Sequence, residues 1–185
     1  MTIHIVLLSG PLAVGKTAVA SILTEKYALK KISSSAQLRA VALDRGLEAT
    51  RGNLQKIGDS LDRETNFEWL VDPVACNHIA SDPFQSSWFI DAVRKPEQIA
   101  HFRARFPKVF HVHLSADEDV LRERFLGRAR VGDDVETGGS YEQSVRHANE
   151  QSARSLGALA DLVLDLVAIT PDDAAAAIVR QSGSL

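Results

Sequence analysis

The chain has 185 residues, a length that fits one domain and allows a substantial buried core. Hydrophobic residues make up 45% and charged residues 24%, which is typical of a folded globular protein and argues against a disordered or fibrous chain. The formal net charge of -3 lacks the basic surplus of proteins that bind nucleic acid or anionic membranes, so we expect neither partner.

Two further features bear on location. The single cysteine, Cys76, cannot form an internal disulfide, which fits a reducing compartment. The apolar run near the N-terminus, residues 3–8, is far shorter than the roughly 20 residues of a membrane span, and no basic segment precedes it. We therefore expect a cytoplasmic protein, either a monomer or a homodimer.

Short apolar runs alternate with helical patterns from the N-terminus to the C-terminus. The predicted strands are residues 3–8, 29–32, 88–90, 109–114 and 162–166. The predicted helices cover residues 17–27, 33–44, 48–80, 97–105, 117–125 and 141–159, and a last one opens at Pro171. This alternation predicts an α/β domain with a five-stranded parallel sheet between helices, and ligands beyond the carboxyl ends of the strands. Residues 132–140 lack apolar rhythm and are predicted to form a mobile loop.

The strongest motif is Gly10-Pro-Leu-Ala-Val-Gly15-Lys16-Thr17, which fits G-x-x-x-x-G-K-[ST] between a predicted strand and a predicted helix. Glycines let backbone N–H groups curve around phosphate oxygens, the lysine adds a cation, and the threonine hydroxyl can bind Mg²⁺. The motif predicts the three-layer P-loop NTPase fold with ATP and Mg²⁺ as cofactors. The expected ATP-binding residues are Gly10, Ala13, Val14, Gly15, Lys16, Thr17 and Ala18.

Three further segments, residues 32–39, 89–98 and 124–128, resemble the adenylate kinase type of nucleoside monophosphate kinase. The resemblance implies that Arg39 and Arg94 grip the acceptor's phosphate and that Gln98 contacts the acceptor. It also implies a helical acceptor-binding region over residues 33–80 and a short lid over residues 128–146. The implied lid arginines are Arg124 and Arg128, which with Lys16 and Arg94 would be catalytic, and Arg130 and Arg146, which would contact the acceptor; Arg124 would also contact ATP.

Asp91 ends a predicted apolar strand, where an acidic residue can organise Mg²⁺ together with Thr17. The six histidines show no metal-ligand spacing, and structural or surface roles are expected for them. The polar residues Arg51, Asn53, Gln55, Asp59 and Asp62 could reach a base or sugar, but we interpret them as a solvated helix face.

Together these features predict an ATP-dependent phosphotransferase that converts a nucleoside or deoxynucleoside monophosphate to the diphosphate. Because a phosphate oxygen is already ionised at neutral pH, such an acceptor needs no general base. Two alternatives stay open: a small-molecule kinase resembling dephospho-coenzyme A kinase, whose acceptor is a hydroxyl, and a regulatory P-loop ATPase without a kinase product. The identity of the acceptor's base and sugar is also left open.

Overall fold

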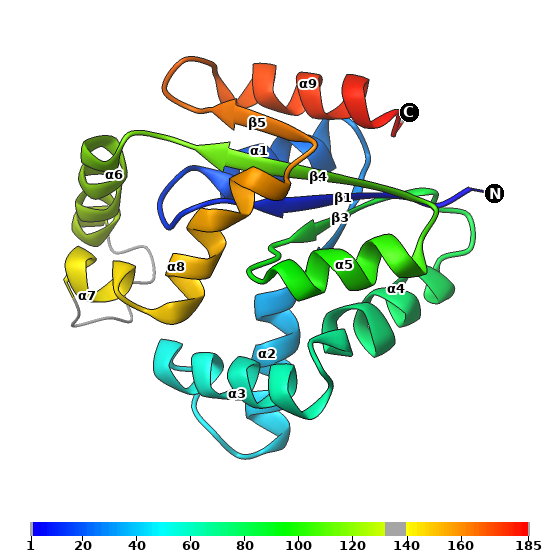
Figure 1. Ribbon diagram of the computed structural model, residues 1–185, viewed down its shortest axis with the longest axis horizontal. Helices are drawn as coiled ribbons and strands as arrows, with labels where there is room; N and C mark the ends of the chain where they lie inside the picture. Colours follow the sequence, from blue (N-terminus) through cyan, green and yellow to red (C-terminus); the bar gives the residue numbers. More distant parts are fainter. Residues whose placement is uncertain (1, 132–139, 185) are drawn as a thin grey trace.

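The computed structural model describes residues 2–131 and 140–184, with the backbone alone for residues 128–131. Its centre is a parallel sheet with the strand order β2-β3-β1-β4-β5 (Figure 1). The strands are β1 (His4–Ser9), β2 (Lys30–Ser33), β3 (Ser87–Asp91), β4 (Lys108–Ser115) and β5 (Leu162–Asp165). The predicted five-stranded parallel sheet is therefore confirmed.

Helices cover both faces of this sheet. Successive residues of β1 point to opposite faces, and both sets are apolar, so each face needs a covering layer. Val6 and Leu8 join the core shared with α1 (Lys16–Glu25) and α9 (Pro171–Ser182). Ile5 and Leu7 join the opposite core, which includes residues of α5 (Pro96–Arg105). The near-continuous apolar strand is typical of a parallel sheet that is buried on both sides.

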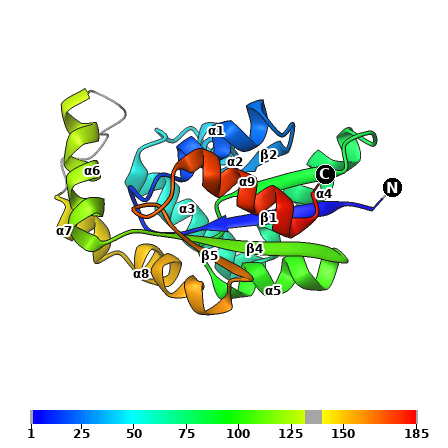
Figure 2. The same ribbon diagram turned by 90° about the horizontal axis from the view of Figure 1, so that it is seen from above.

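The remaining helices gather mainly around the carboxyl ends of the strands. They are α2 (Ser34–Asp44), α3 (Arg51–Glu64), α4 (Cys76–Ser81), α6 (Glu118–Val131), α7 (Tyr141–Val145) and α8 (Ala148–Ser155). In Figures 1 and 2, α6 lies beyond the end to which β4 points, and Figure 1 shows α2 and α3 on the side of the sheet away from α9. No helix in the described ranges has the length and apolar character needed to cross a membrane.

The structure corrects the prediction of one helix over residues 48–80. The helix α3 ends at Glu64, and Asn66 and Phe67 then adopt left-handed backbone conformations. Two short turns, η1 (Glu68–Leu70) and η2 (Val71–Ala75), follow before α4. Pro73 lies within η2, and a proline cannot donate the hydrogen bond of a continuous α-helix.

The predicted helix over residues 141–159 is likewise divided, into α7, α8 and the turn η3 (Leu156–Leu159). The break occurs at His147, whose ring Nδ1 accepts a hydrogen bond from the Asn149 backbone N–H and so caps α8. The predicted loop over residues 132–140 lies outside the described residues except for Ser140, which caps α7.

Candidate active site

The loop between β1 and α1 has a backbone that requires glycine at its start. Gly10 has φ of 139°, and a Cβ added there would collide with the carbonyl oxygen of Leu114 on β4. Gly15 has φ of 111°, and Ala13 between them is also left-handed, with φ of 65°. The glycine pattern therefore reflects both a close approach to the sheet and an unusual backbone path.

Lys16 and the start of α1 present positive charge at this loop. The Lys16 Nζ donates hydrogen bonds to the carbonyl oxygens of Gly10 and Pro11, each at 2.7 Å, and so lies across the loop. Gly15 caps α1 without any side-chain hydrogen bond. An anion at this helix N-terminus would meet backbone N–H groups, the helix dipole and the lysine ammonium together.

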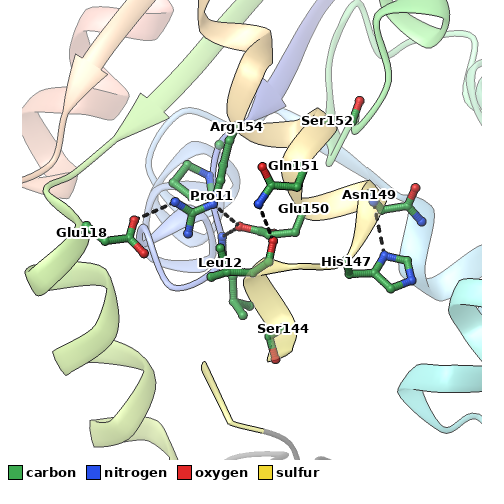
Figure 3. A network of polar contacts seen from close by, with 12 residues as sticks. Pro11, Leu12, Glu118, Ser144, His147, Asn149, Glu150, Gln151, Ser152 and Arg154 are labelled. Atoms are coloured by element: carbon green, nitrogen blue, oxygen red, sulfur yellow. Dashed lines mark hydrogen bonds and ion pairs between the residues drawn. The ribbon is translucent and has the colours of Figure 1, made fainter. Parts of the chain in front are cut away.

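A carboxylate from α8 holds the middle of the loop. Glu150 is only 4% exposed, and its Oε1 accepts a hydrogen bond from the Leu12 backbone N–H at 2.7 Å (Figure 3). The same oxygen accepts from Arg154 Nε at 3.3 Å. Arg154 also donates to Glu118 Oε2 at 2.6 Å, and this contact is the main cause of a lowered pKa at Glu118. The loop is thus connected through α8 to α6.

Arg124, predicted to contact ATP and the transferred phosphate, braces the same loop. Its Nη1 donates to the carbonyl oxygen of Val14, and its Nη2 to that of Leu166, both at 2.9 Å. Its guanidinium therefore joins the loop to the segment after β5, and Arg124 is not among the residues that line the cavity described below.

Two histidines lie behind the loop in the sheet. Ser9 Oγ is 2.7 Å from His111 Nε2 and 2.9 Å from His113 Nδ1, and all three side chains are buried. Burial, followed by the charges of His111 and Lys16, lowers the pKa of His113 to about 4, and burial also lowers the pKa of His111. Both imidazoles are therefore neutral at pH 7, as expected of structural histidines.

A cavity of about 880 Å³ extends from the phosphate loop to α3 and α5. Gly15, Thr17 and Ala18 line it at the loop end. The rest of its wall comes from six helices, the segment after β3 and one turn. The polar and charged residues of that wall are Ser21, Ser34, Ser35, Arg39, Arg51, Gln55, Asp62, Arg94, Lys95, Gln98 and Asn149. The apolar side chains that line it are Leu12, Leu38, Leu54, Trp69, Ala92 and Phe125.

The cavity carries an excess of positive charge. Among the described residues, none of Arg39, Arg51, Arg94 and Lys95 has a carboxylate within ion-pair distance. Arg39 and Arg94 are exposed, whereas Arg51 is half-buried and donates to Ser144 Oγ at 3.3 Å. Burial, followed by the charge of Arg94, lowers the pKa of the Arg51 guanidinium. Two cations therefore line one cavity, and the half-buried one is destabilised by the charge of the other.

At the other end of α3, Asp62 carries the one carboxylate among the described residues that line the cavity. Its Oδ1 accepts hydrogen bonds from Trp69 Nε1 at 2.7 Å and from Gln98 Nε2 at 3.4 Å. Burial raises the pKa of this carboxyl group, and the hydrogen bonds oppose that rise only in part. Gln98 is buried and fixed on both sides, because its Oε1 accepts from the Arg94 backbone N–H.

The structure brings most of the predicted site together. Arg39, Arg94 and Gln98 line the cavity with Thr17, whereas Gly10, Ala13 and Val14 form the loop behind it. Asp91 lies at the end of β3 and binds Lys31 through an Nζ to Oδ2 contact of 2.6 Å. Arg146 is exposed at the end of α7 and does not line the cavity. The side chains of Arg128 and Arg130 lie outside the described residues.

The interpretation of residues 51–62 as a solvated face is wrong for three side chains. Arg51, Gln55 and Asp62 line the cavity, and Asp62 is 7% exposed. The spacing of Arg51, Gln55 and Asp62, four and then seven residues, places them along one side of a helix. That side also carries Leu54 and Gly58, so the combination of polar spacing with apolar neighbours was the available signal.

Comparisons with known proteins agree with this architecture. A sugar kinase from Janibacter sp. HTCC2649 has 20% sequence identity and a TM-score of 0.60, with 100% of this chain and 96% of that chain covered. A putative kinase from Chloroflexus aurantiacus j-10-fl has 19% identity and a TM-score of 0.62, with 98% and 99% covered. Shikimate kinase from Aquifex aeolicus has 17% identity and a TM-score of 0.55, with 96% and 95% covered.

At such identities the likeness establishes the fold alone, a five-stranded parallel sheet between helices. No curated protein sequence matches the chain. Residues 9–141, from the end of β1 through the phosphate loop and the whole cavity wall on α2 and α3, match the sequence model of a family described as an AAA domain. That match covers well over half of the chain, and the protein belongs to the AAA domain family.

Proposed function

We propose that this protein is an ATP-dependent phosphotransferase that transfers the γ-phosphoryl group of ATP to a nucleoside or deoxynucleoside monophosphate. The whole chain acts as one kinase domain in this proposal. The phosphate loop binds the donor, and the cavity wall formed by α2, α3 and the segment after β3 binds the acceptor. Both substrates then meet beyond the carboxyl ends of the strands, where parallel α/β sheets bind ligands.

The observation that carries the proposal is the pair Arg51 and Arg94 beside the phosphate loop. Two like charges in a partly desolvated cavity repel one another unless an anion lies between them. Arg39 adds a third cation at the same wall. Guanidinium groups bind phosphate oxygens in a bidentate manner, so an acceptor that already carries a phosphate group satisfies this arrangement.

The position of the carboxylates favours a phosphate nucleophile over a hydroxyl. A hydroxyl acceptor requires a base beside the transferred phosphoryl group. Glu150 and Asp91 lie near the loop, but neither lines the cavity. Glu150 accepts from Leu12 and Arg154, and Asp91 binds Lys31. Asp62 follows Arg51 by eleven residues on α3, which is about 16 Å along the helix axis. This separation disfavours the sugar, shikimate or dephospho-coenzyme A type of acceptor, whose reacting group is a hydroxyl.

The residues at the loop supply positioning and charge stabilisation. Lys16 and the α1 N-terminus stabilise negative charge on the β- and γ-phosphates. Thr17 lines the cavity, and its hydroxyl is an oxygen donor of the kind that Mg²⁺ prefers. Asp91 would exchange its contact with Lys31 to help hold Mg²⁺, which would neutralise charge on the donor phosphates. Arg51 and Arg94 hold the acceptor's phosphate, whose ionised oxygen attacks the γ-phosphorus in line, and the bond from that phosphorus to the bridging oxygen of the β-phosphate breaks to release ADP.

The test measures product formation from Mg-ATP and each ribo- and deoxyribonucleoside monophosphate, with dephospho-coenzyme A, gluconate and shikimate as hydroxyl acceptors. We expect a nucleoside diphosphate from at least one monophosphate, and a loss of about 10² to 10³ in kcat for Lys16→Ala because one transition-state cation is removed. Lys56→Ala, an exposed lysine on α3, is the matched control.

Two results would contradict the proposal. Product from a hydroxyl acceptor alone would identify a small-molecule kinase of another class. ADP formation at the same rate with every acceptor and with none would identify a regulatory ATPase.

A further inference from the structure

Asp62 has a carboxylate oxygen that the protein itself leaves unused. The side chain is 7% exposed, and its Oδ1 accepts both hydrogen bonds, from Trp69 and from Gln98. Its Oδ2 has no hydrogen-bond partner among the described residues, although Asp62 lines the cavity. This oxygen is not among the buried atoms without a partner, so it is open to the cavity, where water or a ligand can donate to it.

The surroundings of Asp62 do not neutralise it. Lys95 and Asp59 are the charged groups that act on it, with opposite effects on its pKa, and neither forms an ion pair or hydrogen bond with it. Trp69 and Gln98 fix the orientation of the carboxyl plane through Oδ1. The remaining oxygen is therefore held in a fixed place as a hydrogen-bond acceptor.

The position of Asp62 along α3 indicates which part of an acceptor it would meet. Arg51 begins the helix at the phosphate-binding end, and Asp62 lies about 16 Å further along the axis. Leu38, Leu54 and Trp69 line the cavity with it and provide apolar surface. A monophosphate held by Arg51 and Arg94 would thus extend its base, the flat and largely apolar end, toward Asp62.

We propose that Asp62 is a specificity-determining residue, whose Oδ2 selects an acceptor base that presents an exocyclic amino group over a base that presents a carbonyl oxygen at the same position. A donor completes the coordination of the oxygen, whereas a carbonyl oxygen facing it is repelled and leaves both groups unpaired. This inference rests on the proposed function, because it takes the acceptor to be a nucleoside monophosphate.

The test uses binding in the absence of ATP, measured by isothermal titration calorimetry. Three pairs of monophosphates differ at one position by amino against oxo: AMP and IMP, CMP and UMP, and GMP and XMP. We expect wild-type protein to bind the amino member of at least one pair about tenfold or more tightly.

Asp62→Asn sharpens the test because its orientation is defined. Trp69 and Gln98 donate to Oδ1, so the amide oxygen of the variant stays there and its NH₂ group replaces Oδ2. A donor then faces the base, and we expect the preference to fall to equality or to invert toward the oxo member. Glu64→Gln, an exposed carboxylate on the same helix, is the control and should keep the wild-type ratio.

An unchanged ratio in a folded Asp62→Asn protein would overturn the inference. A change confined to ribo- against deoxyribonucleotides would also overturn it, because Oδ2 would then contact the sugar. Binding that is selective by this criterion without any transfer from Mg-ATP would support the role of Asp62 and contradict the proposed kinase activity. Phosphoryl transfer from Mg-ATP at the same rate and with the same base preference in Asp62→Asn would support the proposed kinase activity and contradict the role of Asp62.

Discussion

The phosphate loop (residues 10–17) and the cavity wall on α3 (residues 51–62) border the same cavity, but their polar groups are paired to different extents. At the loop, every polar group named has a partner within the protein. Lys16 donates to two carbonyl oxygens, and the Leu12 N–H donates to Glu150. The Val14 carbonyl oxygen accepts from Arg124. On the wall, the cations Arg51 and Arg94 line the same cavity, and one oxygen of Asp62 has no partner among the described residues.

This difference separates two sources of binding energy. Contacts within the protein fix the shape of the loop, so a donor phosphate meets a preorganised site and little ordering is required on binding. The wall keeps uncompensated positive charge and an acceptor open to the cavity, and a ligand can pair with both. Substitutions at the loop should therefore reduce stability, whereas substitutions at the wall should reduce acceptor binding with little loss of stability.

The largest stability effect on the loop side should come from the histidine behind it. The pKa of His113 is about 4 in the folded protein and near its ordinary value of 6.5 in the unfolded chain. Between these values the unfolded chain binds more protons, so stability is lost as the pH falls from about 6.5 toward 4, by at most about 3 kcal/mol.

Urea unfolding at several pH values across that window measures the slope. His113→Gln should flatten the slope, and His78→Gln, at an exposed position on α4, should not. If the unfolding free energy of His113→Gln depends on pH as strongly as that of the wild type, protonation of His113 does not control the stability of the protein in this pH window.

Glu150→Gln should have the next largest effect. Glutamine can still accept from the Leu12 N–H, but the hydrogen bonds from Leu12 and Arg154 lose their charge-assisted character. We expect the free energy of unfolding to fall by about 1 to 2 kcal/mol in urea titrations at pH 7.

Glu123→Gln, at an exposed position on α6, is the matched control and should change stability little. If Glu150→Gln unfolds at the same urea concentration as the control, the contact from α8 does not stabilise the loop. The proposed stability contribution of the loop contacts would then be wrong for Glu150.

Arg51→Met should change stability least, and any change should be a gain rather than a loss. It removes a desolvated charge and its repulsion with Arg94, at the loss of one long hydrogen bond to Ser144. We expect unchanged or slightly higher thermal stability, together with a rise of about tenfold or more in the acceptor KM, since a charge-assisted phosphate contact is lost.

Arg63→Met, exposed on the same helix, should leave both quantities near wild type. A loss of stability in Arg51→Met as large as that in Glu150→Gln would erase the distinction between the two sides. The KM for ATP serves as an internal reference, because Arg51 belongs to the acceptor wall and should not change it.

Local patterns predicted the elements whose physical cause is local. Ser33 and Thr170 cap α2 and α9 through hydrogen bonds to the third residue of each helix. The division of the segment over residues 64–76 was not predicted, because its turns depend on burying Trp69, Leu70 and Val74 against the sheet. Helical propensity alone does not reveal that competition.

The sequence by itself determined the phosphate loop and the parallel sheet, since the first follows from a short motif and the second from strand periodicity. The cavity arginines Arg39 and Arg94 came from the resemblance to nucleoside monophosphate kinases. Only the tertiary structure decided that Glu150 holds Leu12 across 138 positions of the chain and that Asp62 is buried with Trp69 and Gln98. A carboxylate on a polar helix looks the same in sequence whether water or protein surrounds it. Its burial depends on which elements pack against that helix, and this packing arises only when the whole chain folds.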